Sequence, residues 1–390
     1  MSNLPLDMIA EILCRLPVKK LLCCRCVSKT WHALIDGPNF INLHLQHSIA
    51  TTSNKNVILK NSDLYSIGFD QLNNFKQLDH PLMCYNHSIR VLGSCNGLLC
   101  ICNVVDDIAL WNPSIRKYIV LPFLPIELKR YLGTCTCRVC AFGLGHDPVN
   151  DDYKVVRIAQ FGGVNGKIFE SEVKVYSLRR NSWRRIGDMP YCVLYPGANG
   201  VFACGALHWL VSQGPESNVA NIIVALDLGV EDYREVPQPE FRDKNFNRDI
   251  GVLGGCLCLL ANFQGQRVDL WVMKEYGMKE SWTKLFSVAQ QEGIGILRSL
   301  KPLAYSKSGS EVLMEHGNLN LLRYDLRRKE VRNIRIQDMP LTFEAEIYVG
   351  SLVPVNPNRP LKGRSRHEHK EIKDRKRRDD FLSEGFKLVL

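Results

Sequence analysis

The spacing of apolar residues along the chain changes once, and the first 45 residues carry the helical spacing. One stripe on a helix is formed by Ile9, Ile12, Leu13 and Leu16, at positions i, i+3, i+4 and i+7. Pro5 suits the first turn of this helix, and Asn3 suits its cap. Pro17 predicts where the helix stops, because a proline inside a helix loses a hydrogen bond and clashes with the preceding turn.

Two more helical pieces are predicted before residue 45. A short apolar piece surrounds Leu21 and Leu22. A third stripe, which runs to the breaker Gly37-Pro38, consists of Cys24, Val27, Trp31 and Leu34. The pattern therefore predicts a unit of three helices over residues 1–45.

From about Asn56 to Pro354 the pattern becomes one of short β-type runs separated by turn residues, and one unit recurs in it. Each unit has an opening glycine, a strand that ends in an anchor residue, a turn and a second anchor. The openings are Asn96-Gly97-Leu98, Cys204-Gly205-Ala206, Gly254-Gly255-Cys256 and Ser308-Gly309-Ser310. The anchor pairs are Trp111 with Tyr118, Tyr176 with Trp183, Leu226 with Tyr233, Tyr324 with Val331, all seven residues apart, and Trp271 with Trp282, eleven apart.

The first anchors of successive units are 65, 50, 45 and 53 residues apart, which suits one four-stranded sheet per unit. A sixth, incomplete unit lies at the front, in Val57–Lys60, Leu64–Phe69 and Phe75–Leu78. The apolar run Ile347–Val353 is expected to supply its missing strand and to close the ring, which removes exposed sheet edges. The prediction is a six-bladed β-propeller over residues 56–354; five blades or an open ring are the alternatives.

Length and composition agree with two folded units. A chain of 390 residues exceeds what a single core usually serves, and 45% hydrophobic with 23% charged residues is ordinary for a folded soluble protein. No window approaches the roughly 20 apolar residues of a membrane span, and no charged leader precedes the first apolar run. We therefore expect an intracellular protein with no membrane partner. Its fifteen cysteines, among them Cys100, Cys102, Cys204, Cys256 and Cys258, are expected to be free core thiols.

The charge of the chain is concentrated in its last residues. The net charge is +10, and residues 359–390 hold eleven Lys and Arg against six Asp and Glu. This composition predicts a basic, disordered tail over residues 355–390. Its run from Lys373 to Arg378 has three readings: a solvated tail, a nuclear-import signal, or nucleic-acid contact. Interleaved acids and the lack of accompanying aromatic residues disfavour nucleic acid.

The helical segment is too small to be stable alone, and it has apolar residues on more faces than three helices can hide. Burial of about six such side chains supplies about 10 kcal/mol before association costs are subtracted. A helical partner is the simplest explanation of that surface. The alternative is that the helices only cap the propeller.

Both regions resemble known domains, and together they give an α+β chain. The stretch LPLDMIAEILCRLPVKKLLCCRCVSKTWHALIDGPNFINLHL resembles the F-box of plant F-box proteins. The stretches GSCNGLLCI, LWNPSIRKYIVLP, FGLGHDPVNDDYKVVRI and EVKVYSLRRNSWRRI resemble the F-box-associated, or F-box/kelch-like, interaction domain. One departure is Cys23-Cys24, where the family often has Arg-Phe.

The resemblance implies a substrate-recognition subunit of an SCF-type ubiquitin ligase. In that family the F-box binds the Skp-type adaptor, the adaptor binds the cullin, and the propeller holds the protein to be ubiquitylated. The implied adaptor contacts are Leu4, Pro5, Ile9, Ile12, Leu13, Leu16, Pro17, Leu21 and Val27. Trp31 is expected to pack within the F-box. The resemblance is closest to members that restrain immune-receptor accumulation, so it suggests an immune receptor as substrate and a cytoplasmic or nuclear location.

The sequence shows no catalytic motif, which agrees with a non-catalytic subunit that needs no cofactor. It has no P-loop, no HExxH pair and no nucleophile elbow. The best metal candidate, Cys135, Cys137 and Cys140 with His146, is a poor match to structural zinc spacing, so no metal is expected.

Substrate contacts are expected from the loops that vary between repeats. The candidate loops are Ala159–Ile168, Gln213–Asn221 and Phe241–Arg248. Two other functions are weighed against the ligase subunit. The first is a stand-alone kelch-like glycan- or protein-binding propeller or enzyme, which predicts polar residues converging on the central channel. The second is a nuclear regulator that uses its basic tail on nucleic acid.

Overall fold

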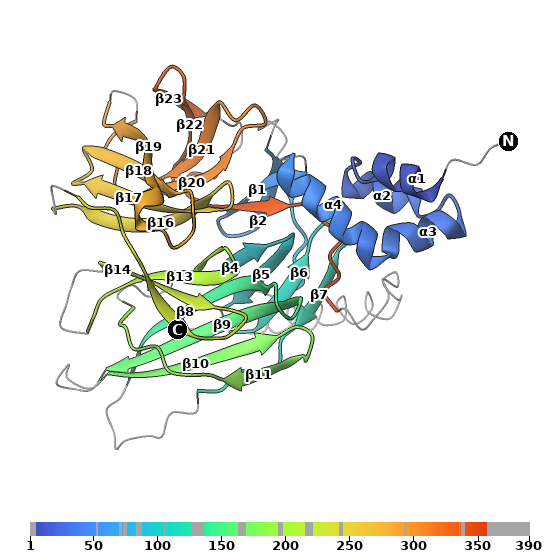
Figure 1. Cartoon of the computed structure of the whole chain (residues 1–390), viewed down its shortest axis with the longest axis horizontal. Coiled ribbons are helices and arrows are strands. Elements are labelled where there is room, and N and C mark those ends of the chain that lie inside the picture. Colours follow the sequence, from blue (N-terminus) through green and yellow to red (C-terminus); the bar gives the residue numbers. More distant parts are fainter. Residues whose placement is uncertain are drawn as a thin grey trace, which may run out of the picture.

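The structure is a computed structural model, shown in Figure 1. It describes residues 5–51, 54–69, 72, 76–82, 88–104, 106–126, 136–162, 169–193, 198–214, 221–241, 245–291, 294–334, 336 and 340–356. Only the backbone is described at 136–139, 162 and 169. In the part of the chain so described, no helix is long and apolar enough to cross a membrane. The predicted tail lies outside the described residues except for its first two positions.

Four α-helices precede the strands in the described residues, where three were predicted. They are α1 (Leu6–Leu13), α2 (Val18–Cys24), α3 (Lys29–Asp36) and α4 (Pro38–Ala50). The prediction of one helix over the third stripe is wrong, because Ser28 begins α3 by accepting a hydrogen bond from the Trp31 amide at 3.1 Å. Gly37-Pro38 ends α3 as predicted but also starts α4, since proline is well suited to the first position of a helix.

Six four-stranded antiparallel sheets follow in the described part of the chain, and they confirm the six-bladed propeller. Blade I holds β4 (Ile89–Cys95), β5 (Leu98–Asn103), β6 (Ile108–Asn112) and β7 (Lys117–Val120). Blade II holds β8 (Thr136–Asp147), β9 (Asp152–Gly162), β10 (Phe169–Ser177) and β11 (Ser182–Arg185). Blade III holds β12 (Val201–Ala203), β13 (Ala206–Val211), β14 (Ile222–Asp227) and β15 (Tyr233–Val236).

The remaining blades have the same strand order. Blade IV holds β16 (Asn247–Leu253), β17 (Cys256–Phe263), β18 (Arg267–Met273) and β19 (Trp282–Ala289), with a 3-10 turn η2 (Lys279–Ser281) before β19. Blade V holds β20 (Leu300–Tyr305), β21 (Glu311–His316), β22 (Asn320–Asp325) and β23 (Glu330–Ile334). Blade VI holds β24 (Glu344–Val349) with β1 (Lys55–Lys60), β2 (Leu64–Gly68) and β3 (Lys76–Gln77).

The paired anchors are cross-strand neighbours in the outer hairpin of each blade. Trp111 lies opposite Tyr118, Tyr176 opposite Trp183, Leu226 opposite Tyr233, and Tyr324 opposite Val331. A residue with a positive φ lies two positions before each second anchor, at Arg116, Asn181, Glu231 and Lys329. The Trp271–Trp282 pairing is wrong: Trp282 lies opposite Met273, because η2 lengthens that hairpin.

The last strand closes the ring, as predicted. β24 pairs with β1 from Lys55↔Val349 to Lys60↔Glu344 and is the innermost strand of Blade VI. The strand begins and ends a few residues before the predicted Ile347–Val353, because residues 350–356 leave the sheet. The innermost strands of successive blades are neighbours around the whole ring, and β24 is next to β4.

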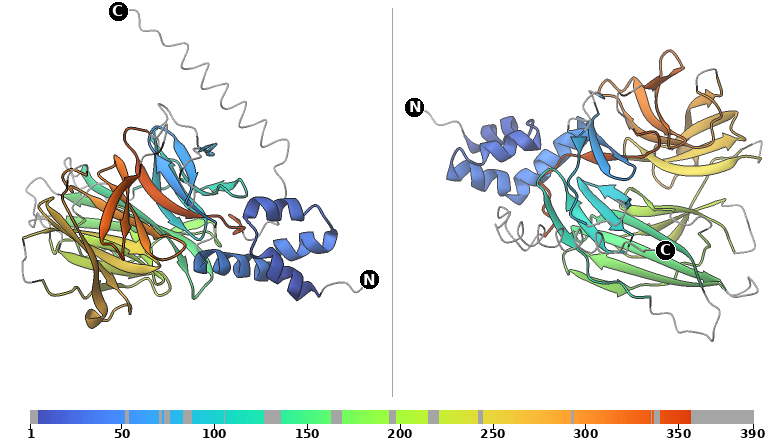
Figure 2. Two further views of the ribbon diagram at one scale, coloured as in Figure 1. Left: turned by 90° about the horizontal axis from the view of Figure 1, so that it is seen from above. Right: turned by 180° about the vertical axis from the view of Figure 1, so that it is seen from behind.

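The order of the strands defines two faces of the propeller. The helix-bearing face carries the turns between first and second strands and between third and fourth strands, such as 96–97 and 113–116. The distal face carries the connections between blades and the loops between second and third strands, such as 104–107 and 264–266. Because α4 leads into β1 and β24 leads into residues 350–356, both chain segments lie on the helix-bearing face. Figure 2 shows the helices on one side of the propeller, with α4 nearest to it.

One hydrophobic core joins the helices to the propeller. It contains Phe40, Ile41 and Leu45 of α4 together with Leu352 and Val353 of the segment after β24, and it continues into Blades I and II. The helices are thus attached through α4, whereas α1 to α3 project beyond it (Figure 1).

Candidate functional site

Part of the helical unit exposes large apolar side chains. In α1, Leu6, Met8 and Ile12 are 50%, 56% and 57% exposed, and Val27, after α2, is 65% exposed. Met8 and Ile12 are four residues apart and so lie on one side of α1. Large apolar groups exposed on so small a helical unit mark an interaction surface. We call these four residues the apolar patch.

The structure separates the predicted adaptor contacts into three groups. Pro5, Pro17, Ile12 and Val27 are exposed, and Ile9 and Leu16 are half-buried. Leu13 and Leu21 are buried, at 2% and 0% exposed, in the core that the helices form with each other. Their side chains therefore support the surface from inside. Leu4 lies outside the described residues. Leu6 and Met8 were not predicted, because the helical spacing singled out Ile9, Ile12, Leu13 and Leu16, of which only Ile12 is exposed.

Polar contacts hold the helices in place beneath the apolar patch. Arg25, after α2, donates to Asp36 of α3 at 2.6 Å. His44 of α4 is fully buried, and its Nε2 is 3.1 Å from the Leu16 carbonyl oxygen. Burial lowers the pKa of His44, so the neutral ring is favoured, and Nε2 then carries the proton that it donates to Leu16. Trp31, half-buried, packs against the same core, as expected.

A buried polar network fixes the chain end where the ring closes. Asn112 donates through Nδ2 to the carbonyl oxygens of Ser351 at 3.1 Å and Val353 at 2.9 Å. Its Oδ1 accepts from the Ser114 amide at 3.0 Å and from the Tyr348 hydroxyl at 3.1 Å. We call the junction of residues 344–353 with residues 96–97 and 112–114 the closing seam. The seam joins Blade VI, Blade I and the segment that carries the helices.

At Gly97 the backbone of Blade I lies close against residues 349–351, where β24 ends. The φ of Gly97 is +83°, and a Cβ there would overlap Ser351 Oγ and lie 2.5 Å from the Val349 carbonyl oxygen. Ser351 Oγ itself donates to the Asn96 carbonyl at 2.9 Å. The opening glycine of this repeat is therefore required both by its backbone conformation and by the seam.

Of the three candidate substrate loops, residues 163–168, 215–220 and 242–244 lie outside the described residues, and the described residues on either side of them lie on the distal face, away from the helices. The segments 159–168 and 213–221 include the loops between second and third strands of Blades II and III, and 241–248 enters Blade IV. In the described part of the last one, Phe241 contacts the rings of Trp271 and Phe246 at centroid distances of 5.6 Å and 4.6 Å. Arg248 stacks on Phe246 at 4.4 Å.

Arg248 is an unusual cation. No ion pair joins it to a carboxylate among the described residues, and its Nε is buried without an acceptor. Burial lowers the pKa of Arg248, and no neighbouring acid opposes this. A charge that lacks a carboxylate partner among the described residues is suited to one on a bound molecule.

A second polar group lies on the inner strands of Blades IV to VI. Lys301 of β20 pairs with Glu346 of β24 at 2.7 Å and interacts with Asp249 of β16. Burial lowers the pKa of Lys301, but the surrounding carboxylates outweigh it and the pKa is raised overall. The sequence did not reveal this convergence of polar residues, because its members are far apart in the chain. It is a cluster of ion-paired side chains.

The cysteine predictions have mixed outcomes. Cys100, Cys102 and Cys258 are buried free thiols, and burial raises the pKa of each, but Cys204 is exposed in a turn. Within the residues that the structure describes, no cluster of His, Cys, Asp and Glu is arranged to hold a metal ion. Of the cysteine group for which no metal was expected, Cys135 lies outside the described residues and only the backbone of Cys137 is described, while His146 Nε2 is 3.0 Å from Asp151 Oδ1.

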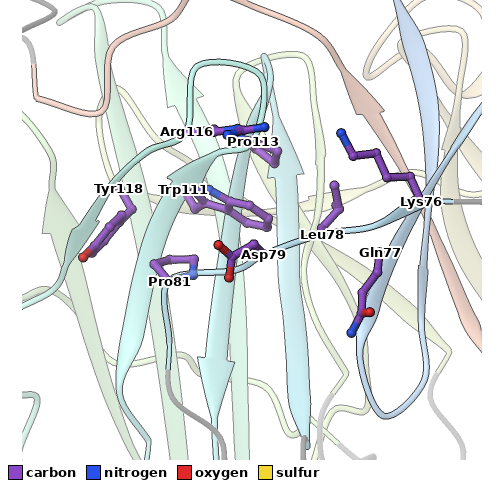
Figure 3. Close-up of a pocket in the computed structure, with 9 residues that line it drawn as sticks. All are labelled: Lys76, Gln77, Leu78, Asp79, Pro81, Trp111, Pro113, Arg116 and Tyr118. Carbon is purple, nitrogen blue, oxygen red and sulfur yellow. The ribbon is translucent and has the colours of Figure 1, made fainter. Parts of the chain in front are cut away.

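One pocket lies in the outer part of the seam between Blade VI and Blade I (Figure 3). Its volume is about 250 Å³. It is lined by Lys76, Gln77, Leu78, Asp79, Pro81, Trp111, Pro113, Arg116 and Tyr118. We call it the seam pocket.

A small helical unit with an exposed apolar patch, fixed to a six-bladed propeller, is the architecture of a two-surface binding protein. Comparison with known proteins gives its family. Residues 1–43 match the F-box domain, and residues 51–356 match the F-box associated beta propeller domain. The chain belongs to the F-box proteins that carry this propeller.

Two relatives match along their whole length. F-box protein CPR1 of Arabidopsis thaliana is 38% identical, and the alignment covers 100% of both chains. F-box protein At4g22390 of the same plant is 36% identical, again over 100% of both chains. Both alignments therefore span the helical unit and the propeller of this chain.

Proposed function

We propose that this protein is a substrate receptor of an SCF-type ubiquitin ligase that binds the Skp-type adaptor through the apolar patch and its substrate through the distal face. The observation that carries the proposal is the placement of the two surfaces. The helices are fixed to one face of the propeller, and the strand ends that flank the candidate substrate loops lie on the other. A substrate on the distal face and an adaptor on the helices can therefore be held at the same time, without competing for surface.

The adaptor surface has an energetic argument. Full burial of a large apolar side chain stabilises by about 1.5–3 kcal/mol, so covering the exposed half of each patch residue contributes about 1 kcal/mol. The four residues of the patch then supply about 4 kcal/mol, to which the exposed Pro5 and Pro17 add. Ile9 and Leu16 contribute their exposed edges, while Leu13 and Leu21 hold the helices in the shape that the adaptor meets.

Affinity for the purified Skp-type adaptor tests this surface. A variant with Ile12→Ala and Val27→Ala changes only exposed positions, so the fold is retained. We expect its dissociation constant to rise by about 30-fold, the scale of two moderate interface contacts. Ile49→Ala is the matched control, because Ile49 is 47% exposed on α4 but lies outside the patch. Equal affinity of the double variant and the control would refute the patch as the adaptor site.

The same proposal makes the chain a holder of substrate with no chemical step of its own. Binding both substrate and ligase raises the effective concentration of the acceptor lysine at the transferring enzyme. Arg248, with Phe241 and Phe246 beside it, gives the distal face a desolvated cation among aromatic rings. This composition is typical of interaction hot spots and suits an acidic segment of a substrate.

For the substrate we propose a plant immune receptor, met in the cytoplasm or nucleus; the support is the family resemblance of the sequence. The half-life of a panel of plant immune receptors, each co-expressed with this chain, tests this. We expect a shortened half-life with the wild type, restored by the Arg248→Ala, Phe241→Ala variant and by the patch variant. Val149→Ala, exposed on the helix-bearing face, should behave as wild type. If no receptor is shortened while adaptor binding is intact, the immune substrate is wrong and the ligase role stands.

A further inference from the structure

The seam pocket combines walls of flat apolar groups with two cations. Trp111, only 4% exposed, belongs to the fully buried strand β6 and is held between Leu99 of β5 and Tyr118 of β7. Pro81 and Pro113 add rigid walls, and Leu78 completes the apolar part. These groups have few rotamers to lose, so the shape of the pocket is set before any ligand arrives.

The cations come from two blades. Lys76 belongs to β3 of Blade VI, and Arg116 belongs to the turn between β6 and β7 of Blade I. In Figure 3 their side chains point toward one another above the Trp111 ring. Neither forms an ion pair with a carboxylate among the described residues. The lining also contains one carboxylate, Asp79, so the pocket has a net charge of +1 and favours a single anionic group.

We propose that the seam pocket binds a small ligand made of one planar ring that bears an anionic group. The ring lies against Trp111 and between the prolines, and the anion is held by Lys76 and Arg116. A volume of 250 Å³ is below the roughly 300–1,000 Å³ of pockets for drug-sized ligands, so one ring with its charged group fills it. The site lies outside both the apolar patch and the three candidate substrate loops, and it does not depend on the ligase role.

Such a ligand would bridge the closing seam. Arg116 and Pro113 are in the same turn as Ser114, whose amide is 2.9 Å from the Tyr348 hydroxyl of β24. A molecule held between β3 and this turn adds contacts between the blade that closes the ring and its neighbour. Binding therefore stabilises the folded chain in proportion to ligand occupancy.

Titration of the full-length chain with phenyl phosphate, followed by ligand-observed NMR, tests the site. Inorganic phosphate and benzyl alcohol are the matched probes that lack the ring or the charge. We expect a dissociation constant of about 1 mM for phenyl phosphate, and binding at least ten-fold weaker for each of the other two. The Lys76→Gln, Arg116→Gln variant should bind phenyl phosphate at least ten-fold more weakly than wild type.

The control variant removes two positive charges that lie outside the pocket. Lys117 and Arg180 lie outside the pocket lining, so a Lys117→Gln, Arg180→Gln variant should bind as wild type does. Any of three results would overturn the proposal. Inorganic phosphate could bind as tightly as phenyl phosphate, or the control variant could lose as much affinity as the pocket variant. The third result is no binding of phenyl phosphate at concentrations up to 10-fold the expected dissociation constant. A phosphotyrosine heptapeptide distinguishes two sources of the same chemistry: tighter binding than phenyl phosphate identifies a protein side chain, and weaker binding a free small molecule.

Discussion

Removal of the Asn112 side chain should open the closing seam. Asn112 is fully buried, and its four shortest hydrogen bonds are two from its Nδ2 to carbonyl oxygens of Ser351 and Val353, and two accepted by its Oδ1 from Ser114 and Tyr348. The Asn112→Ala variant loses all four. It also leaves the two carbonyl oxygens without these donors, inside a core that water enters only if the segment moves.

The magnitude follows from the number of bonds. A net contribution of about 1 kcal/mol for each buried hydrogen bond gives a loss of about 4 kcal/mol. This is a large share of the 5–15 kcal/mol that typically stabilises a domain. Because the partners belong to residues 348–353, we expect the loss to appear first as release of this segment and of the β24 edge.

Hydrogen exchange followed by mass spectrometry measures the release of the segment, and urea unfolding measures the loss of unfolding free energy. Peptides that cover residues 344–353 should exchange at least ten-fold faster in Asn112→Ala than in wild type. Asn262→Ala is the matched control. Asn262 also pins a passing segment, donating to the carbonyl oxygens of Leu297 at 2.7 Å and Arg298 at 3.0 Å and accepting from the Gly265 amide at 2.8 Å.

The control variant should be destabilised in Blade IV without any faster exchange at residues 344–353. The reasoning is refuted if Asn112→Ala loses less than about 1 kcal/mol of unfolding free energy, the value of a single bond. It is equally refuted if the two variants accelerate exchange at residues 344–353 to the same extent.

Three further predictions concern the same fold. Gly97→Ala forces a side chain into a positive φ and into Ser351, so we expect a loss of about 2–4 kcal/mol in urea unfolding, and Gly205→Ala, at a similar φ with no contact closer than 3.4 Å, should lose only about 1 kcal/mol. Burial lowers the pKa of His208 to about 4 from an ordinary 6.5, so the folded state favours the neutral ring. The free energy of unfolding should therefore be full above pH 6.5 and fall by up to about 3 kcal/mol as the pH drops toward 4. Unfolding measured against pH should show this fall in wild type and not in His208→Gln. Ser28→Ala removes the cap of α3 and should lower the stability of the helical unit by about 1 kcal/mol, measured as faster amide exchange at Trp31.

The sequence was most informative where contacts are local. The anchors seven residues apart were recognisable because they are cross-strand neighbours in one hairpin, such as Trp111 and Tyr118. Ring closure was also predictable, since five complete repeats and one incomplete repeat require a strand from elsewhere. The fourth helix was missed because Gly37-Pro38 both ends one helix and starts the next, and the pattern was interpreted only as an end.

Features made by long-range contacts were not predictable from the pattern. Asn112 has the sequence context of an ordinary turn residue, and its partners Ser351, Val353 and Tyr348 are more than 230 positions away. Leu6 and Met8 belong to the apolar patch, but no periodicity separates them from core residues, and only their exposure does. The seam pocket likewise joins β3 to β6 across a blade boundary, so neither half of its lining suggests a site alone.

The closure of the ring by β24 has a consequence for how the protein is made. On the ribosome, β1 to β3 emerge before any other strand, yet the partner that covers the edge of β1 is the last strand to be synthesised. Throughout translation this edge presents unpaired backbone groups, a template for pairing with other chains. The α4 helix likewise lacks part of its core during translation, because its core partners Leu352 and Val353 are synthesised still later. A truncated mRNA would therefore yield a chain in which Blade VI and the packing of the helices are both incomplete. Such a product is suited to removal by the cell's own quality control.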